Sequence, residues 1–194
     1  MGLLVMILGL VLFLGVHTLT TQRKLRARLI ASTGEGGYKI GYALVSVAGL
    51  VLIVWGFGHY RAAGWIDVWY PPKVLKHVTV GLMLPAVIMV VAAYIRGRIY
   101  TAVKHPMLTG VKLWAAAHLL ANGDLGSIIL FGSFLAWAVF DRISLKRRAD
   151  PGAPPIPVGG PANDLIAVAV GIVAYLALGF AFHPVVIGVP VFGA

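Results

Sequence analysis

The sequence predicts an all-α protein with about six membrane-spanning helices. Of its 194 residues, 60% are hydrophobic and only 11% are charged, which lies well outside the usual range of soluble domains. The apolar residues gather into six runs, and most of the lysines and arginines lie between them. We therefore expect a single polytopic membrane domain that covers residues 1–194.

The six apolar runs differ in length. Four of them are close to the roughly 20 residues that a spanning helix needs, whereas the fourth and fifth are shorter and are joined only by Asn122-Gly123-Asp124. We expect these two to form a tight helical hairpin, in which Gly126, Gly132 and Ser133 permit close approach. Two ordinary spans and a buried two-helix unit both fit this pattern. The runs are Leu3–Thr20, Ile40–Gly58, Val78–Ile95, Met107–Ala121, Leu125–Phe140 and Leu165–Phe182.

The first run and the last linker need separate interpretation. The first run lacks a basic segment before it and is followed by basic residues rather than a cleavage site, so we expect a retained helix and not a signal peptide. Residues 150–163 are rich in Pro and Gly, which predicts an extended linker. The sixth helix is expected to begin after Asn163-Asp164, since both residue types are good caps.

The net charge of +10 follows the loops. Eleven Lys and Arg fall in the segments after the first, third and fifth runs, and three fall in the loop from His59 to His77. The positive-inside rule then predicts that the linker of residues 150–163 is cytoplasmic and that both termini are periplasmic. We attribute this charge to topology and to contact with anionic membrane lipid, and not to nucleic-acid binding.

The absence of cysteine and the small number of acidic residues limit the kinds of catalytic or metal site that the chain can form. No cysteine is present, which excludes disulfides, thiolate nucleophiles and covalently attached c-type haem. One Glu and five Asp, none of them adjacent, make a carboxylate dyad or a hard-cation site a poor expectation. Histidine is the remaining candidate for metal or cofactor binding.

Two histidines are expected inside the membrane. His17 lies near the cytoplasmic end of the first run, on a helix face with Leu10, Phe13 and Leu14. An apolar wall with one imidazole suits a macrocycle and an axial nitrogen, but a histidine that is hydrogen-bonded to a neighbouring helix has the same pattern.

His118 shares a face with Val111, Trp114 and Ala115, and Asn122 continues that stripe. The three alanines before it would admit another helix or a flat ligand. Here too a structural role and a ligand role remain open.

The other histidines have simpler expected places. Pro106 forces His105 to the start of the fourth helix, where it caps and orients that helix. His77 opens the third helix and fits an interfacial anchor, while His59 and His183 lie near the outer boundary and are not chosen as site residues.

The stretch "KHPMLTGVKLWAAAHLLANGDLGSIILFGSFLAWAVFDRISLKRR" resembles the signature of the NnrU family of bacterial inner-membrane proteins, and "GVHTLTTQRKLRARL" and "YPPKVLKH" are similar to its other marked segments. The likeness runs from about Leu3 to Arg148. It implies a small polytopic inner-membrane protein linked to nitrite and nitric oxide metabolism in denitrification.

The same pattern is similar to zeta-carotene isomerase, a membrane enzyme that contains haem b. That resemblance implies that His17 and His118 are the ligands of haem iron. His105 and Trp114 would then support the site, and we place His77 and Asn122 with them.

The chain also resembles the isoprenylcysteine methyltransferases in the basic His-Pro start of its hairpin. Those enzymes continue with an Arg and a Glu pair, whereas this chain has "DRISLKRRADPGAPP" and no Glu there, so S-adenosylmethionine chemistry is not expected. The function expected is a haem b protein of nitrogen-oxide metabolism that works with a reductase or another redox partner. Two alternatives stay open: a haem-dependent isomerase of a carotenoid-like lipid, and a non-catalytic assembly or transport factor for a nitrogen-oxide reductase. The sequence leaves open whether the chain is an enzyme.

Overall fold

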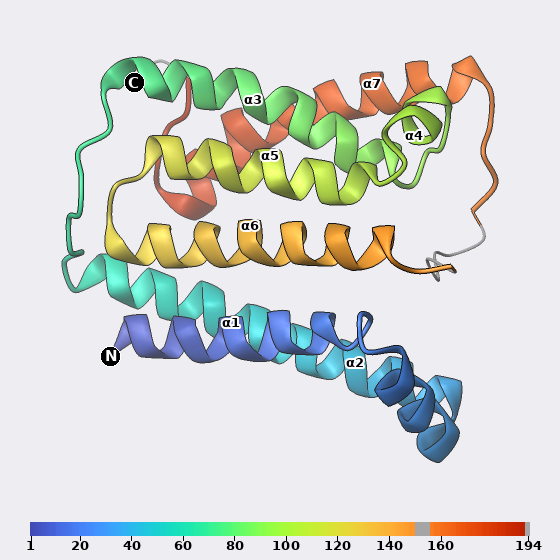
Figure 1. Cartoon of the computed structure of the whole chain (residues 1–194). Helices are drawn as coiled ribbons and strands as arrows, with labels where there is room; N and C mark the ends of the chain where they lie inside the picture. Colours follow the sequence, from blue (N-terminus) through green and yellow to red (C-terminus); the bar gives the residue numbers. More distant parts are fainter. Residues whose placement is uncertain (150–155, 193–194) are drawn as a thin grey trace. The chain divides into compact units, whose positions relative to one another are not determined.

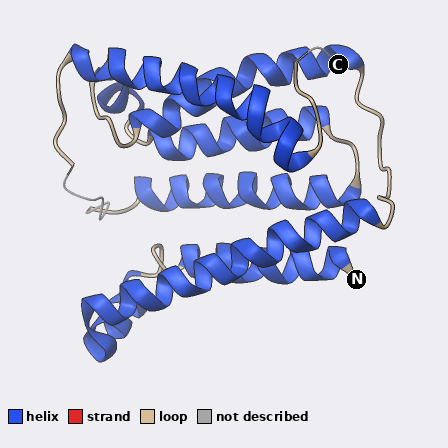
Figure 2. Cartoon of the chain, turned by 180° about the vertical axis from the view of Figure 1, so that it is seen from behind, coloured by secondary structure: helices blue, strands red, loops and turns tan. Residues whose placement is uncertain are grey.

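The computed structural model describes residues 1–149 and 156–192, which are helical and contain no β-strand (Figures 1 and 2). The described helices group into two compact units. Unit 1 contains Met1–Tyr70 and Asn122–Arg148, and unit 2 contains Pro71–Ala121 and Ala149–Ala194. In chain order the elements are α1 (Gly2–Thr18), α2 (Arg23–Ala62), α3 (Lys73–Ala92), α4 (Arg98–Val103), α5 (Pro106–Ala121), α6 (Leu125–Lys146), α7 (Pro161–Ala177) and the π-helix η1 (Leu178–Ile187).

The six apolar runs each lie on a helix, so the predicted all-α membrane class is confirmed. Among the described residues, four helical stretches are long and apolar enough to cross a membrane: α2, α3, α6, and α7 continued by η1. The helices α1 and α5 have 17 and 16 residues, somewhat short of the ~20 that a full span needs.

Glycines allow α1 and α2 to pack backbone against backbone in unit 1, where the two helices run side by side (Figure 1). A Cβ on Gly9 would lie 2.6 Å from the backbone nitrogen of Ile53, and a Cβ on Gly49 would lie 2.8 Å from that of Phe13. Close approach through small residues is a usual way for membrane helices to associate, because lipid gives apolar side chains little reason to prefer each other.

The helix α2 begins 17 residues before its apolar run, in a basic segment that the sequence analysis treated as a loop. Leu, Arg and Ala in this segment are good helix formers, and a bend at Gly34, whose φ is 73°, separates the basic part from the apolar part. Only glycine adopts such a φ at little cost. The exposed ion pair between Glu35 and Lys39, 2.8 Å, lies just after the bend.

Tyr60, near the end of α2, connects α2 to the loop that follows it and to the start of α6. Its hydroxyl accepts hydrogen bonds from the backbone N–H groups of Ile66, 2.9 Å, and Gly126, 3.1 Å. A Cβ on Gly126 would collide with the Tyr60 ring, whereas a Cβ on Gly132 would meet open space. The close approach predicted for Gly126 is therefore made with Tyr60, and Gly132 makes none within the described residues.

The short connection predicted between the fourth and fifth apolar runs joins α5 to α6. Asp124 caps α6, because its carboxylate accepts the N–H of Ser127 at 2.9 Å. Residues 122–124 thus link the end of α5 to the start of α6, which belong to unit 2 and unit 1 respectively. Tight packing between these two helices stays a prediction.

Unit 2 is built on α3, against which α5 and α7 pack. The buried Thr79 hydroxyl donates to the carbonyl of Ala117 on α5, 2.8 Å, and the Tyr175 hydroxyl on α7 donates to the carbonyl of Val80, 3.1 Å. Gly110 lies against the Ala86 carbonyl, 2.8 Å from where its Cβ would be. Polar side chains that reach a backbone carbonyl are expected between helices in lipid, where no water competes.

The start of α7 differs from the prediction. The helix begins at Pro161 with Gly160 at its N-cap, so the linker ends at residue 160 rather than 163, and its residues 150–155 lie outside the described part. Asn163 and Asp164 do not cap α7. Asn163 donates to the Arg96 carbonyl, 2.8 Å, and Asp164 binds the first turn of α4. Sequence spacing could not reveal this, because the acceptor and donors are more than 60 residues apart.

Asp164 therefore acts as an N-cap for another helix. Its carboxylate accepts the N–H groups of Arg98, 3.0 Å, and Ile99, 2.9 Å, which no residue of α4 itself can satisfy. We expect Asp164→Ala to lower the free energy of unfolding by about 1–2 kcal/mol, measured as a lower melting temperature in detergent. Asp164→Asn keeps one acceptor oxygen and should lose less. Equal melting of the wild type and Asp164→Ala would contradict this role.

Candidate functional site

His17 lies in a group of aromatic side chains in unit 1. Its ring stacks on Phe13, with the ring centroids 4.2 Å apart, and lies 5.2 Å from Tyr42 and 5.8 Å from Trp137. The Nδ1 atom is 2.6 Å from the carbonyl oxygen of Phe13, so this nitrogen carries the proton and Nε2 is the acceptor in the neutral ring. Such an imidazole has its other nitrogen in the form that binds a metal.

Two polar atoms in this part of unit 1 are buried without a hydrogen-bond partner: the hydroxyl of Tyr38 and Nε1 of Trp137. Tyr38 lies next to Tyr42, 6.1 Å between ring centroids, and Trp137 meets the His17 ring edge-on. Nearly all buried polar groups in proteins have a partner. These two donors near His17 are therefore exceptions among the buried polar groups of unit 1.

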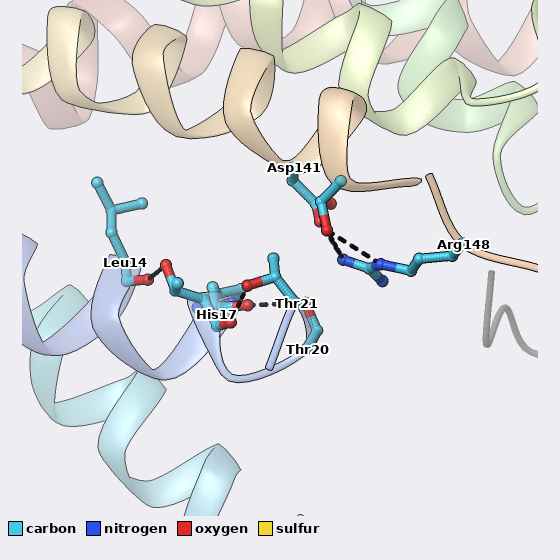
Figure 3. A network of polar contacts seen from close by, with 8 residues as sticks. Leu14, His17, Thr20, Thr21, Asp141 and Arg148 are labelled. Atoms are coloured by element: carbon cyan, nitrogen blue, oxygen red, sulfur yellow. Dashed lines mark hydrogen bonds and ion pairs between the residues drawn. The ribbon is translucent and has the colours of Figure 1, made fainter. Parts of the chain in front are cut away.

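An ion pair stabilises the end of α6 in the same unit. Arg148 donates to the carboxylate of Asp141 at 3.1 Å and to the hydroxyl of Ser144 at 2.7 Å, and the side chains of the pair are only 11% and 12% exposed (Figure 3). In the same view, the hydroxyl of Thr20 donates to the His17 carbonyl, 2.8 Å. The pairing with Arg148 compensates part of the desolvation cost of the nearly buried Asp141 carboxylate.

His118 lies in unit 2 on α5 and is held in the same way as His17. Its Nδ1 is 2.8 Å from the carbonyl oxygen of Trp114, and the two rings are 5.3 Å apart. The neighbouring Ala115 and Ala117 are fully buried. His118 is therefore a second imidazole of the Nδ1–H form at a largely apolar position.

A bond from Nδ1 to the carbonyl four residues earlier is not by itself a sign of function. His59 makes the same bond to Trp55, 3.1 Å, but is exposed. What distinguishes His17 and His118 is that they are partly buried among aromatic side chains.

His183 is a residue that the sequence analysis passed over. Its ring centroid lies 6.2 Å from that of His118, with 33° between the planes, and its Nδ1 is buried without a partner. It lies on η1, directly before Pro184. A His-Pro step occurs here for the second time in the chain, after His105-Pro106, and this repetition was the available signal.

The supporting residues occupy varied places. His105 directly precedes α5, and its carbonyl accepts the N–H of Thr109, 3.1 Å, so it takes the expected position at the start of that helix. His77 is exposed in the first turns of α3, and Asn122 follows the end of α5 within unit 1. The structure brings Trp114 into contact with His118 and places His17 in the other unit.

The two units thus hold one candidate histidine each. Among the described residues, no three His, Cys, Asp or Glu side chains come close enough together to bind a metal ion. All the buried side-chain polar atoms found without a partner in residues 1–149 and 156–192 belong to Tyr38, Trp137 and His183, which lie around these two histidines.

Comparison with known families gives a match over nearly the whole chain. The family described as NnrU protein matches residues 5–191. The chain belongs to the NnrU family. No curated protein and no solved structure matches it. The family segment begins within α1, includes the other helices of both units, and contains all six histidines of this NnrU protein.

Proposed function

We propose that this NnrU-family membrane protein binds haem b and takes part in nitrite and nitric oxide metabolism in the bacterial inner membrane. His118 is one axial ligand in this proposal, and His17 is the second ligand that the resemblance to zeta-carotene isomerase implies. Haem, when bound, would supply a redox centre that can also bind small nitrogen oxides.

The residues present fit such a group. Neutral imidazole is a good iron ligand, and both histidines have Nδ1 held by a carbonyl, the usual arrangement behind a metal-bound Nε2. A metal ion with only protein ligands would need more donors than any cluster of the described residues offers. Haem needs only one or two, because the macrocycle brings four nitrogens.

The observation that carries the proposal is the distribution of buried polar atoms without partners. They occur on side chains around His17 and beside His118, and an unsatisfied buried polar group is costly. A bound group that supplies hydrogen-bond acceptors or a metal would satisfy them.

The protein's own residues would then have distinct roles. His118 would hold the iron, and the resemblance to zeta-carotene isomerase implies His17 as its partner. The carbonyls of Phe13 and Trp114 would orient the two rings and keep the proton on Nδ1. The aromatic ring of Phe13, stacked on His17, excludes water from the imidazole. The basic segments after α1, α3 and α6 favour the cytoplasm for those loops.

The first test is the optical spectrum of the wild-type protein, purified in detergent from haem-replete cells. We expect a Soret band with the low-spin visible bands of two imidazole ligands and a pyridine haemochrome of haem b. His118→Ala should shift the iron to high spin or lower the haem content at least several-fold, and His59→Ala, at an exposed histidine, is the matched control. A wild-type protein with no Soret band would overturn the proposal and favour a non-catalytic assembly role.

A further inference from the structure

The pair formed by His118 and His183 is the closest approach of two imidazoles recorded in unit 2. The rings come from different elements, α5 and η1, and their centroids are 6.2 Å apart. Nothing in the sequence analysis paired them. The distance between the two ring centroids can be compared with the distances expected for a hydrogen bond and for a shared metal.

Three arrangements can be compared by simple geometry. With about 1.2 Å from a ring centre to its nitrogen, an in-line hydrogen bond of about 3 Å would put the centres about 5.4 Å apart. A tetrahedral metal with ~2.0 Å bonds would put them about 5.2 Å apart. Two imidazoles on opposite sides of one metal would have centres about 6.4 Å apart. The observed 6.2 Å is longer than the first two arrangements require and is compatible with the last one.

Two further observations point to a ligand between these rings. An ordinary contact of two aromatic rings would account for the spacing, but it would leave the buried Nδ1 of His183 without a hydrogen-bond partner. A metal bound at this Nδ1 would satisfy it. In addition, His183 lies on a ten-residue π-helix, a form that is rare and is often found at functional sites. The ring of Pro184 and its missing N–H disturb the regular hydrogen bonding of a helix, which accounts for the wider turn that carries His183.

We propose that His183 supplies the axial nitrogen opposite His118, in place of His17, so that both iron ligands come from unit 2. This inference rests on the proposed function, because haem is the metal group that requires no third protein donor. It changes the role of His17, whose aromatic surroundings would then bind another part of the ligand or a water molecule. It also makes η1 the element that completes the site.

The test compares spin state and haem content across four variants of the full-length protein: His118→Ala, His183→Ala, His17→Ala and His59→Ala. We expect the first two to lose the low-spin spectrum and the last two to keep it. Added imidazole should restore the low-spin bands in His183→Ala, because it fills the opened axial position. His183→Gln, which has a similar size but is a poor iron ligand, guards against a simple folding defect, and elution as a single peak in detergent confirms that each variant is folded.

The outcomes separate the two proposals. Loss of the low-spin spectrum in His17→Ala and His118→Ala, with His183→Ala and His183→Gln unchanged, would overturn the role of His183 and leave haem binding intact. The absence of haem from the wild type would overturn both. A high-spin spectrum in His183→Gln that imidazole converts to low spin would support the pair.

Discussion

Replacing His118 by alanine is expected to remove most of the Soret absorbance of this protein. His118 is the ligand common to both possible pairs, with His17 or with His183, so no other histidine can compensate for its loss. An iron that loses one of two strong nitrogen ligands changes spin state and dissociates more readily. The expected result is at least a several-fold loss of haem per protein, measured by pyridine haemochrome, with any remaining haem in the high-spin state.

A neighbouring substitution provides the control. Trp114→Phe keeps the backbone carbonyl that binds Nδ1 of His118 and keeps an aromatic ring beside the imidazole. We expect it to retain most of the haem with a small shift of the band. An unchanged spectrum in His118→Ala would show that His118 does not bind the iron. A histidine that serves only in packing can be replaced without an effect on haem.

The second large effect is expected on stability, at the contact of α1 with α2. A Leu at position 9 would place its side chain where the backbone of Ile53 now lies, 2.6 Å from the position of a Cβ. Neither backbone can yield without separating the helices, so Gly9→Leu should cost at least about 3 kcal/mol. We expect a severe loss of folded, monodisperse protein in detergent.

The chain offers a matched control on the same helix. Gly15→Leu introduces the same side chain on α1, but nothing lies within 4 Å of the Cβ that it would add, and Gly15 is exposed. We expect this variant to melt within a few degrees of the wild type. Gly9→Ala is the graded case, because a single methyl group already meets the backbone nitrogen of Ile53. If the yields and melting temperatures of Gly9→Leu and Gly15→Leu agreed, the close packing of α1 on α2 would be wrong.

The sequence by itself determined the membrane class and the helical state of each apolar run. A long apolar run excludes any other backbone state in lipid, because every N–H and C=O must be satisfied within the segment. The six runs therefore became helices regardless of their neighbours. The same argument fixed His105 at the start of α5, since Pro106 has no N–H and suits the first helical position.

The tertiary structure decided which residues meet. Asp164 looked like the cap of its own helix, yet it binds the first turn of α4, because a side chain takes the nearest unsatisfied donors in space and not in sequence. Likewise, Gly126 and Gly132 were equivalent in sequence, but only Gly126 lies against a ring. Small residues permit contact without specifying a partner.

Part of the candidate site could also be predicted from the sequence, and part of it depends on packing. Composition and motif selected His17 and His118, because an ionisable group at membrane depth needs a reason to be there. Apart from the proline that follows His183, the local sequences of His183 and His59 are alike, since both lie at the end of an apolar run. Their difference arises from packing: a π-helical turn brings His183 to 6.2 Å from His118 and leaves its Nδ1 buried, while His59 stays exposed. Distances between side chains on different helices depend on how those helices pack, and the order of residues along one helix does not contain that information.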